Sequence, residues 1–246
     1  WQWKANGGSR TTFTESGDNP GGGYQANTTA GFSIVDFVGT GANGTVQHGL
    51  GVAPRWYIVK NRDRSANWQV YHEDNGNTHY IKLNTTGAKL DNHEIFNDTS
   101  PTSSVFSVGI DQSVNFNGEN HIAYVFAEKQ GFSKFGKFQG NGSSDGPFIY
   151  TGFSPAWIMI KGSDVNGYWV IIDTKRNYPN ISGGRLGAQA NDAEYGSSNI
   201  DFCSNGFKIR ASGSDSDTNN DGSSYIYMAF ADSPFVSSEG VPTTAR

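Results

Sequence analysis

The sequence GVAPRWYIVKNRD at residues 51–63 has a close counterpart, FSPAWIMIKGSD, at residues 153–164. Each is a short apolar run that begins just after a proline and ends in a polar turn, which is typical of a β-strand. Proline suits a strand entrance, where its missing N–H breaks no ladder hydrogen bond. Trp56 and Trp157 lie 101 positions apart, so the two stretches align residue by residue. We therefore expect the same strand to occur twice.

The correspondence extends outward in both directions at nearly the same spacing. Further matching pairs are residues 31–41 with 131–142, residues 67–74 with 168–175, Phe106 with Phe207, and residues 122–128 with 226–232. The last pair is offset by 104 positions, which places three extra residues in the second copy. The expected scaffold anchors are Pro54, Trp56, Trp68, Pro155, Trp157 and Trp169. Convergence of turn-rich β sequences is the alternative, but the shared order favours duplication of one supersecondary unit.

The composition points to an all-β fold. The chain has 246 residues, 32 of them glycine, and its 13% aromatic content supplies a core where only 35% of residues are hydrophobic. Many turn-forming residues suit short strands and disfavour long helices. We predict two tandem, related β-sandwich-like repeats of about 100 residues, with short hairpins and almost no helix. The best candidate for a minor helix is NDAEYG at residues 191–196.

The repeat also suggests how the chain is divided. The expected parts are residues 1–30, an N-terminal arm or linker that could add a strand; residues 31–130, the first β repeat; residues 131–235, the second β repeat; and residues 236–246, a C-terminal extension. WQWK at residues 1–4 is the candidate added strand, whereas NPGGGYQANTT at residues 19–29 has the composition of a loop or linker.

Charge and hydropathy exclude some classes of partner. The formal net charge is -5 and no basic stripe occurs, so we expect no nucleic-acid binding. No stretch approaches the roughly 18 apolar residues that a membrane span needs, so we expect no membrane insertion. Nucleophile and P-loop motifs are also missing from the sequence. Glu128, Asp173 and Asp232 could pair as glycosidase carboxylates, but capping of strand ends is the better interpretation. We expect no catalytic residues.

One motif resembles a calcium loop. DTNNDG places Asp217, Asn219 and Asp221 at alternate positions before a glycine, with Asp215 as an additional candidate ligand. The twelfth position from Asp217 is Met228, so the usual bidentate glutamate is missing. The first repeat has SVNFNG at the corresponding place, which shares the turn shape without the charge. A hairpin-loop role is therefore the stronger interpretation, and calcium is the alternative cofactor.

Histidines and aromatic residues are the other candidates for a site. His48, His72, His79, His93 and His121 form no metal-ligand spacing, and His72 aligns with Asp173, which argues against a chemical role shared by the repeats. Aromatic rings can stack on sugars where they face solvent. The candidate rings are Trp56, Trp68, Tyr80, Trp157, Tyr168 and Trp169, most of which we expect in the core.

Several blocks resemble a domain family of tail and appendage proteins from marine bacteriophages. They include GFSIVDFVGTG, HGLGVAPRWYIVKNRD, YVFAEKQGFSKFGKFQGNGSSDGPFIYTGFSPAWIMIK, DFCSNGFKIR and YIYMAFADSPF, and the resemblance covers residues 30–246. This resemblance implies a virion component such as a tail fibre, knob or surface decoration, with no catalytic residues to carry over. The acidic loop at residues 211–222 departs from the family pattern and leaves loop-specific or calcium binding open.

The resemblance also suggests partners. We expect a homo-oligomer, with a trimer as one candidate form, that contacts other virion proteins and has host-surface glycans as candidate receptors. The expected location is the virion. The alternatives are a carbohydrate-binding module without a virion, a subunit of a secreted or surface filament, and, last, an enzyme acting on surface polysaccharide.

Overall fold

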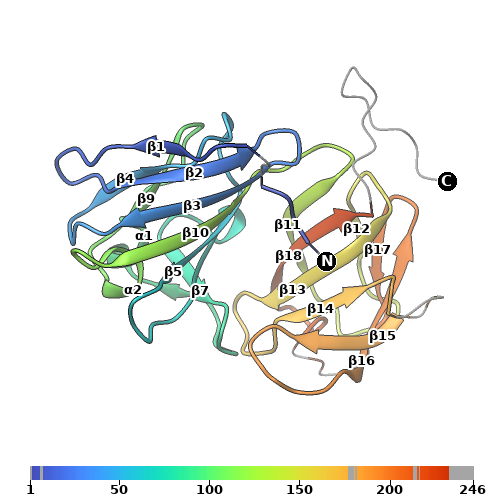
Figure 1. The fold of residues 1–246 in the computed structure, drawn as a ribbon. Helices are drawn as coiled ribbons and strands as arrows, with labels where there is room; N and C mark the ends of the chain where they lie inside the picture. Colours follow the sequence, from blue (N-terminus) through green and yellow to red (C-terminus); the bar gives the residue numbers. More distant parts are fainter. Residues whose placement is uncertain are drawn as a thin grey trace. The chain divides into compact units, whose positions relative to one another are not determined.

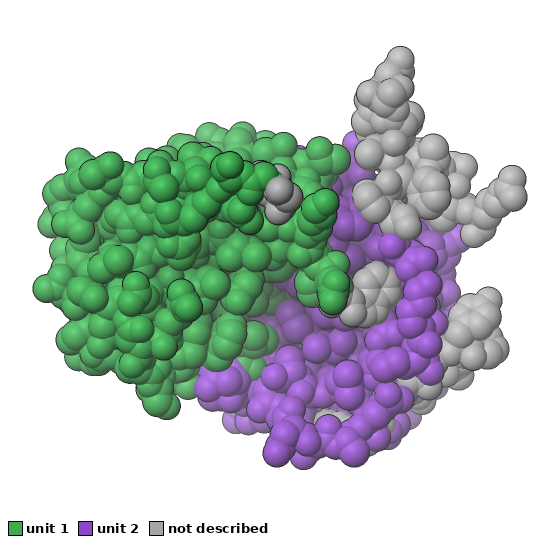
Figure 2. All heavy atoms as spheres, in the orientation of Figure 1, with its two compact units in different colours: residues 1–83, 89–128 green, residues 84–88, 129–246 purple. Residues whose placement is uncertain are grey.

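The computed structural model describes residues 2–5, 8–176, 180, 182–212, 215 and 217–232. The fold is all-β, as predicted, and the chain divides into two compact units (Figure 2). Unit 1 consists of residues 1–83 and 89–128, and unit 2 consists of residues 84–88 and 129–246. The extension predicted at residues 236–246 lies outside the described residues.

The described residues of unit 1 form ten strands and three short helical turns. Most of these elements are labelled in Figure 1. The strands are β1 (Thr11–Phe13), β2 (Gly21–Asn27), β3 (Phe32–Val38), β4 (Gly44–Gln47), β5 (Trp56–Asn61), β6 (Gln69–His72), β7 (His79–Lys82), β8 (Leu90–Asp91), β9 (Val105–Val108) and β10 (Asn120–Phe126). The turns are the 3-10 helix η1 (Glu73–Asn75) and the helices α1 (His93–Phe96) and α2 (Gln112–Asn115).

Eight of these strands form one antiparallel sheet in the order β1-β2-β3-β10-β5-β6-β7-β8, and β4 pairs with β9 in a second sheet. One core cluster joins the two sheets, because it includes Val46 and Phe106 from the small sheet and Tyr57 from the large one. The Tyr57 ring stacks on Tyr71 with centroids 4.6 Å apart and lies 4.9 Å from Phe106. The aromatic residues therefore supply much of this core.

The prediction of a loop or linker at residues 19–29 is wrong, because Gly21–Asn27 is strand β2, paired with β3 along its whole length. Glycine is needed here for space. A Cβ on Gly22 would lie 2.1 Å from the Asp36 carbonyl oxygen, whereas one on Gly23 would meet only the end of the flexible Arg10 side chain, at 2.3 Å. β1 adds the next strand, at Thr11–Phe13, whereas the described part of residues 1–4 is not in a strand.

The described residues of unit 2 form eight strands. They are β11 (Ser133–Gln139), β12 (Phe148–Tyr150), β13 (Pro155–Gly162), β14 (Val170–Asp173), β15 (Ser182–Gly187), β16 (Tyr195–Cys203), β17 (Gly206–Ile209) and β18 (Ser224–Ala231). The sheet order is β11-β18-β13-β14-β15-β16-β17-β12, and one core cluster joins residues from both ends of this sheet, such as Phe207 and Tyr227. The helix predicted at residues 191–196 is wrong, because residues 191–194 are irregular and Tyr195 begins β16.

The two units share a strand order. The series β3-β10-β5-β6-β7 in unit 1 corresponds to β11-β18-β13-β14-β15 in unit 2, and the pair β4–β9 corresponds to β12–β17. Backbone bonds correspond as well: Gly41 N–H donates to Asn115 O in unit 1, and Gly142 N–H donates to Asn219 O in unit 2. These shared features support the duplication inferred from the sequence.

A short segment from the connection between β7 and β8 belongs to unit 2. There, Gly167 N–H donates to the Thr86 carbonyl at 2.9 Å, and Ala88 N–H donates to Asn166 Oδ1 at 3.0 Å. The Lys161 ammonium reaches the same Thr86 carbonyl at 3.3 Å. Unit 2 is therefore not one continuous stretch of sequence.

Candidate functional site

In the loop that resembles a calcium site, Asp217 and Asn219 are bonded to other groups of the protein. Asp217 is buried; its Oδ1 accepts from Tyr168 N–H at 2.6 Å, and its Oδ2 lies 2.6 Å from Arg185 Nη1. Asn219 Oδ1 accepts from Asn141 N–H, whereas Asp221 is exposed. An ion at Asp217 would have to displace the Arg185 guanidinium, which already neutralises that carboxylate.

The same loop has a structural counterpart in unit 1. Asn219 Nδ2 donates to Ser143 O at 2.8 Å and to Ala211 O at 2.7 Å. In unit 1, Asn115 Nδ2 donates to Ala42 O at 2.5 Å and to Gly109 O at 3.1 Å. Each asparagine thus ties two other backbone segments to its own turn, which supports the hairpin-loop interpretation of both motifs.

Asp215 acts within its own turn. Its Oδ1 accepts from Asp217 N–H at 3.0 Å, and its Oδ2 accepts from the Thr218 hydroxyl at 2.8 Å. Among the described residues, no group of three or more His, Cys, Asp or Glu side chains is arranged to hold a metal. Calcium binding therefore stays a hypothesis from the sequence pattern, without a gathered set of ligands to support it.

The buried histidines make structural hydrogen bonds. His48 Nδ1 accepts from Leu50 N–H at 3.2 Å, and His121 Nδ1 lies 3.0 Å from Glu119 O. Burial lowers the pKa of both imidazoles, against the opposing effect of their backbone carbonyl partners. His79 and His93 are less buried.

His72 and Asp173 perform the same local task despite their different chemistry. His72 Nδ1 accepts from Asp74 N–H at 3.0 Å, and Asp173 Oδ1 accepts from Lys175 N–H at 2.9 Å. Both side chains cap the turn that follows a strand. A shared role therefore does exist at this position, and it is structural.

The carboxylates considered for catalysis are each paired with a cation. Glu128 Oε2 lies 3.8 Å from Arg55 Nε, Asp173 Oδ2 lies 2.6 Å from Arg176 Nε, and Asp232 Oδ2 lies 3.1 Å from Lys175 Nζ. The pairing with Arg176 contributes to the lowered pKa of Asp173, whose burial acts in the opposite direction. These contacts are those expected at strand ends.

The predicted anchors are largely inside the molecule. Five of the anchors are buried: Pro54, Trp56, Pro155, Trp157 and Trp169. The three tryptophans among them therefore cannot form a solvent-facing platform for a sugar. Trp68 is half-buried and stacks on Tyr124 with centroids 6.3 Å apart.

Tyr80 differs from the other candidate rings because it lines a surface hollow. This hollow, with a volume of about 330 Å³, lies entirely in unit 1 and is here called the Tyr80 hollow. The residues used to define it are Arg64, Gln69, Tyr80, Lys82, Asp111 and Ser113. Gln69 and Lys82 are a cross-strand pair of β6 and β7, so they and Tyr80 share one face of the sheet. Asp111 and Ser113 come from the start of α2.

A hydrogen-bonded chain runs along one side of the Tyr80 hollow. Gln69 Nε2 donates to the Ser113 hydroxyl at 2.8 Å, and that hydroxyl donates to Asp111 Oδ1 at 2.5 Å. Gln69 is only 3% exposed, and its side-chain oxygen is buried without a hydrogen-bond partner among the described residues. A buried acceptor left unpaired is unfavourable, so a donor that reached this oxygen would be stabilising.

Two further polar groups of the hollow are available. Within the described part of the chain, neither Asp111 Oδ2 nor the Tyr80 hydroxyl makes a direct hydrogen bond to protein. Burial raises the pKa of Tyr80, and the charge of Asp111 raises it further, which indicates that the two groups are close. The hollow thus offers two acceptors and one hydroxyl.

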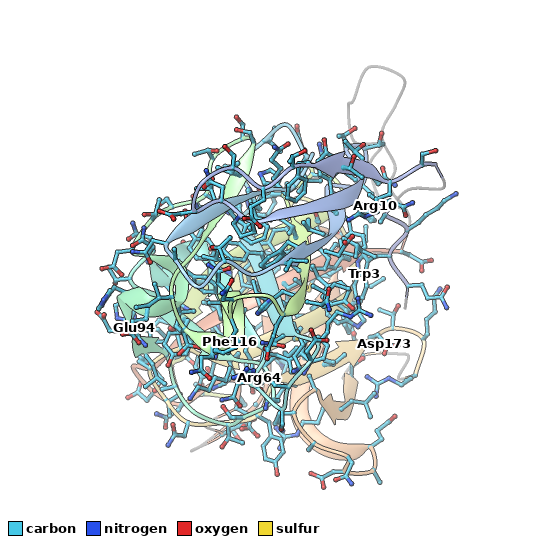
Figure 3. All side chains as sticks on the ribbon, turned by 60° about the vertical axis from the view of Figure 1, so that its left-hand side comes forward. Trp3, Arg10, Arg64, Glu94, Phe116 and Asp173 are labelled. Carbon is cyan, nitrogen blue, oxygen red and sulfur yellow. The ribbon has the colours of Figure 1, made fainter. Side chains whose placement is uncertain are left out.

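Arg64 holds the rim of the Tyr80 hollow in place. Its guanidinium carbon lies 3.8 Å from the centre of the Phe116 ring, and the two residues are labelled in Figure 3. The Arg64 Nε donates to Glu119 Oε2 at 2.7 Å. A second Arg64 nitrogen, Nη1, donates to Gln112 Oε1 at 2.6 Å. These contacts fix one wall of the hollow without using its unpartnered atoms.

Another hollow of unit 1 contains an ion pair that occupies two of its charged groups. It measures about 370 Å³ and is lined by Arg10, Asp36 and Arg62, among others. Arg10 Nε donates to Asp36 Oδ1 at 2.8 Å, so these two charges satisfy each other. We therefore take the Tyr80 hollow as the candidate functional site.

The sequence did not predict Gln69 or Asp111 as site residues. The two lie on different elements, and their approach depends on strand register and on where α2 packs. Tyr80 was a candidate as an aromatic ring, but nothing in its local sequence distinguished it from the buried rings.

No helix among the described residues is long and apolar enough to cross a membrane. No curated protein matches the chain, and no solved structure matches it. Residues 1–234 match the model of a family described as Domain of unknown function (DUF7483). Because this match covers most of the chain, the protein belongs to that family.

Proposed function

We propose that the chain is a non-enzymatic module of a phage particle, part of a tail fibre, knob or surface decoration, that contributes to host attachment. The observation that carries this proposal is the resemblance of blocks such as GFSKFGKFQGNG at residues 131–142 to phage appendage domains. Two features support it: an all-β scaffold with large buried rings, and candidate carboxylates that are paired with cations. Host-surface glycans are the proposed receptors.

Immunogold labelling of particles of the phage that encodes the chain tests the location. We expect label on the tail or the particle surface, and label restricted to lysate debris would overturn the proposal. Light scattering coupled to size exclusion tests assembly. We expect a homo-oligomer, with a trimer as one candidate, or a complex with another virion protein. A stable monomer that binds no virion protein would contradict the structural role.

A carbohydrate-binding module without a virion is the second candidate. The Tyr80 hollow favours it, because a concave surface with unpaired polar atoms is suited to a sugar. Glycan binding combined with no particle association would support this alternative over the first.

A further inference from the structure

The counterpart of the Tyr80 hollow in unit 2 is filled by a side chain of the protein itself. In β6 and β7, Gln69 is paired with Lys82; in β14 and β15, Val170 is paired with Gly187. Tyr80 lies two residues before Lys82, and Arg185 lies two residues before Gly187. Arg185 is therefore the counterpart of Tyr80.

The acidic side of the hollow is also present in both units. Asp111 lies four residues before Asn115, and Asp215 lies four residues before Asn219. Each aspartate accepts from the backbone N–H two residues later, at 2.8 Å in unit 1 and 3.0 Å in unit 2. Asp111 and Asp215 therefore occupy equivalent positions.

In unit 2 the Arg185 guanidinium occupies this place. Its Nη1 lies 2.6 Å from Asp217 Oδ2 and 4.0 Å from Asp215 Oδ1, and its carbon lies 5.8 Å from the centre of the Tyr168 ring. Its side chain is only 9% exposed. Unit 2 thus supplies internal hydrogen-bond donors and an aromatic surface at the position where unit 1 is open.

In unit 1 no described residue supplies the hydrogen-bond donors that Arg185 supplies in unit 2. Tyr80 replaces the arginine, Ser113 replaces Asp217, and Asp111 Oδ2 and Gln69 Oε1 accept no hydrogen bond from any residue that the structure describes. A ligand that fits has to donate to these two oxygens.

The charges around the Tyr80 hollow decide between ligand classes. Lys82 Nζ lies 5.9 Å from the centre of the Tyr80 ring, and Arg64 forms the rim. Lys82 opposes a cationic ligand and Asp111 opposes an anionic one, whereas the charge of Arg64 is already paired with Glu119. A neutral polyol satisfies both sides, since each hydroxyl can donate to an acid and accept from an ammonium.

The size of the hollow points to a single sugar ring. A hollow of about 330 Å³ lies near the lower end of the range for ligand pockets, which is about 300–1,000 Å³. Tyr80 is only 7% exposed, so its hydroxyl, and not the face of its ring, is the part that a pyranose can use.

From these observations we propose that the Tyr80 hollow binds one neutral hexopyranose residue of a surface glycan, with Asp111 and Gln69 accepting from its hydroxyls. This inference rests on the proposed attachment function and names its receptor class. The corresponding hollow of unit 2, closed by Arg185, binds no sugar.

Saturation-transfer NMR and calorimetry on the full chain test the proposal. The probes are methyl glycosides of glucose, galactose and mannose, with methyl glucuronide and glucosamine as charged comparisons. We expect saturable binding of at least one neutral hexoside, and weaker binding of both charged sugars. Failure of every neutral hexoside to saturate, or preference for a charged sugar, would overturn the proposal.

Two conservative variants locate the binding. Asp111→Asn keeps an oxygen to cap Ser113 but loses the acceptor that faces the hollow, and should weaken binding by about tenfold, the effect of one charged hydrogen bond. Tyr80→Phe keeps the ring and should weaken it by about threefold. The control is Asp145→Asn, which removes a surface carboxylate of unit 2 paired with Lys208. Equal affinity in Asp111→Asn and in the wild type, with both folded by circular dichroism, would exclude the Tyr80 hollow.

The two proposals fail in distinguishable ways. Hexoside binding without particle labelling would overturn the virion location and keep the sugar site. Particle labelling without hexoside binding would overturn only the sugar site.

Discussion

In each unit, the side chain of one buried asparagine links separate backbone segments by hydrogen bonds. Asn115 accepts from Thr40 N–H at 2.9 Å and donates to Ala42 O and Gly109 O, and Asn219 makes the equivalent bonds in unit 2. Both asparagines are fully buried. Their partners are backbone groups on separate segments, so each side chain replaces hydrogen bonds that a regular sheet would otherwise supply.

Substitution of these asparagines should destabilise one unit at a time. Asn115→Ala leaves three backbone groups of unit 1 without their partner, and we expect a loss of about 2–4 kcal/mol in the stability of that unit. Asn219→Ala should do the same in unit 2. Hydrogen exchange of peptides from β10 and β18 would show which unit opens.

The control for this pair is Asn117→Ala, which changes an exposed asparagine near the same turn. It should leave exchange unchanged. If Asn117→Ala had the effect of Asn115→Ala, the hydrogen bonds of the buried side chain would not be the cause.

The buried histidines should make unit 1 sensitive to mild acid. Burial holds the pKa of His48 and His121 below the ordinary value of about 6.5. As the pH falls below about 6.5, the unfolded chain takes up protons that the folded unit does not, so the stability of the folded unit decreases. We expect faster hydrogen exchange in unit 1 at pH 5.5 than at pH 7.5, after correction for the intrinsic exchange rate.

Unit 2 is the internal control for this titration, because all five histidines of the sequence lie in unit 1. His121→Gln should reduce the acid sensitivity of unit 1. An equal loss of protection in unit 2 over this pH range would rule out the histidines as the cause.

At the scale of elements, the sequence predicted those strands whose own residues carry the signal. Strands β5 and β13 follow from apolar runs bounded by proline and polar turns, and both are central and buried. Strand β2 was missed because its first residues are three glycines, which give no apolar pattern. Strand β16 was missed at its start because its pairing with β15 and β17 is not local.

If β2 is held by close backbone packing, Gly22 should tolerate no side chain. In Gly22→Ala the new Cβ would meet the Asp36 carbonyl oxygen, which belongs to the backbone of β3 and cannot move alone. We expect a loss of about 1–3 kcal/mol, typical of overpacking, measured by urea unfolding.

The matched substitution is Gly87→Ala, where the nearest atom is the Thr85 hydroxyl at 3.7 Å. It should be close to neutral. Equal stability of the two variants would mean that β2 is not packed as closely as its pairing with β3 implies.

At the scale of the whole molecule, the repeat pattern predicted where most of each unit lies, but not that residues 84–88 belong to unit 2. The expected boundary at residues 130–131 is close to the observed one at 128–129. The prediction came from the sequence block at residues 31–41, which has its counterpart at residues 131–142. Residues 84–88 are assigned to unit 2 by bonds to Asn166, Gly167 and Lys161 that no local pattern encodes. The Tyr80 hollow escaped prediction for the same reason, since strand register brings its residues together.

The segment 84–88 should therefore contribute to the stability of unit 2. Lys161 is fully buried, and its ammonium donates to Gly162 O at 2.8 Å, with Thr86 O and Val165 O as longer acceptors. Burial lowers its pKa to about 8, against the opposing effect of the Asp217 charge, and the carbonyl partners compensate a buried cation. Loss of the Thr86 carbonyl leaves the cation less compensated and also frees Gly167 N–H.

Deletion of residues 84–88, with Leu83 joined to Lys89 by two glycines, tests this contribution in the whole chain. We expect faster hydrogen exchange at Gly167 and along β13, while β3 and β10 of unit 1 keep their protection. Asn166→Ala removes only the bond to Ala88 and should have a smaller effect in the same direction. If the deletion left unit 2 as protected as in the intact chain, these bonds would not stabilise it, and residues 129–246 would be sufficient for the fold of unit 2.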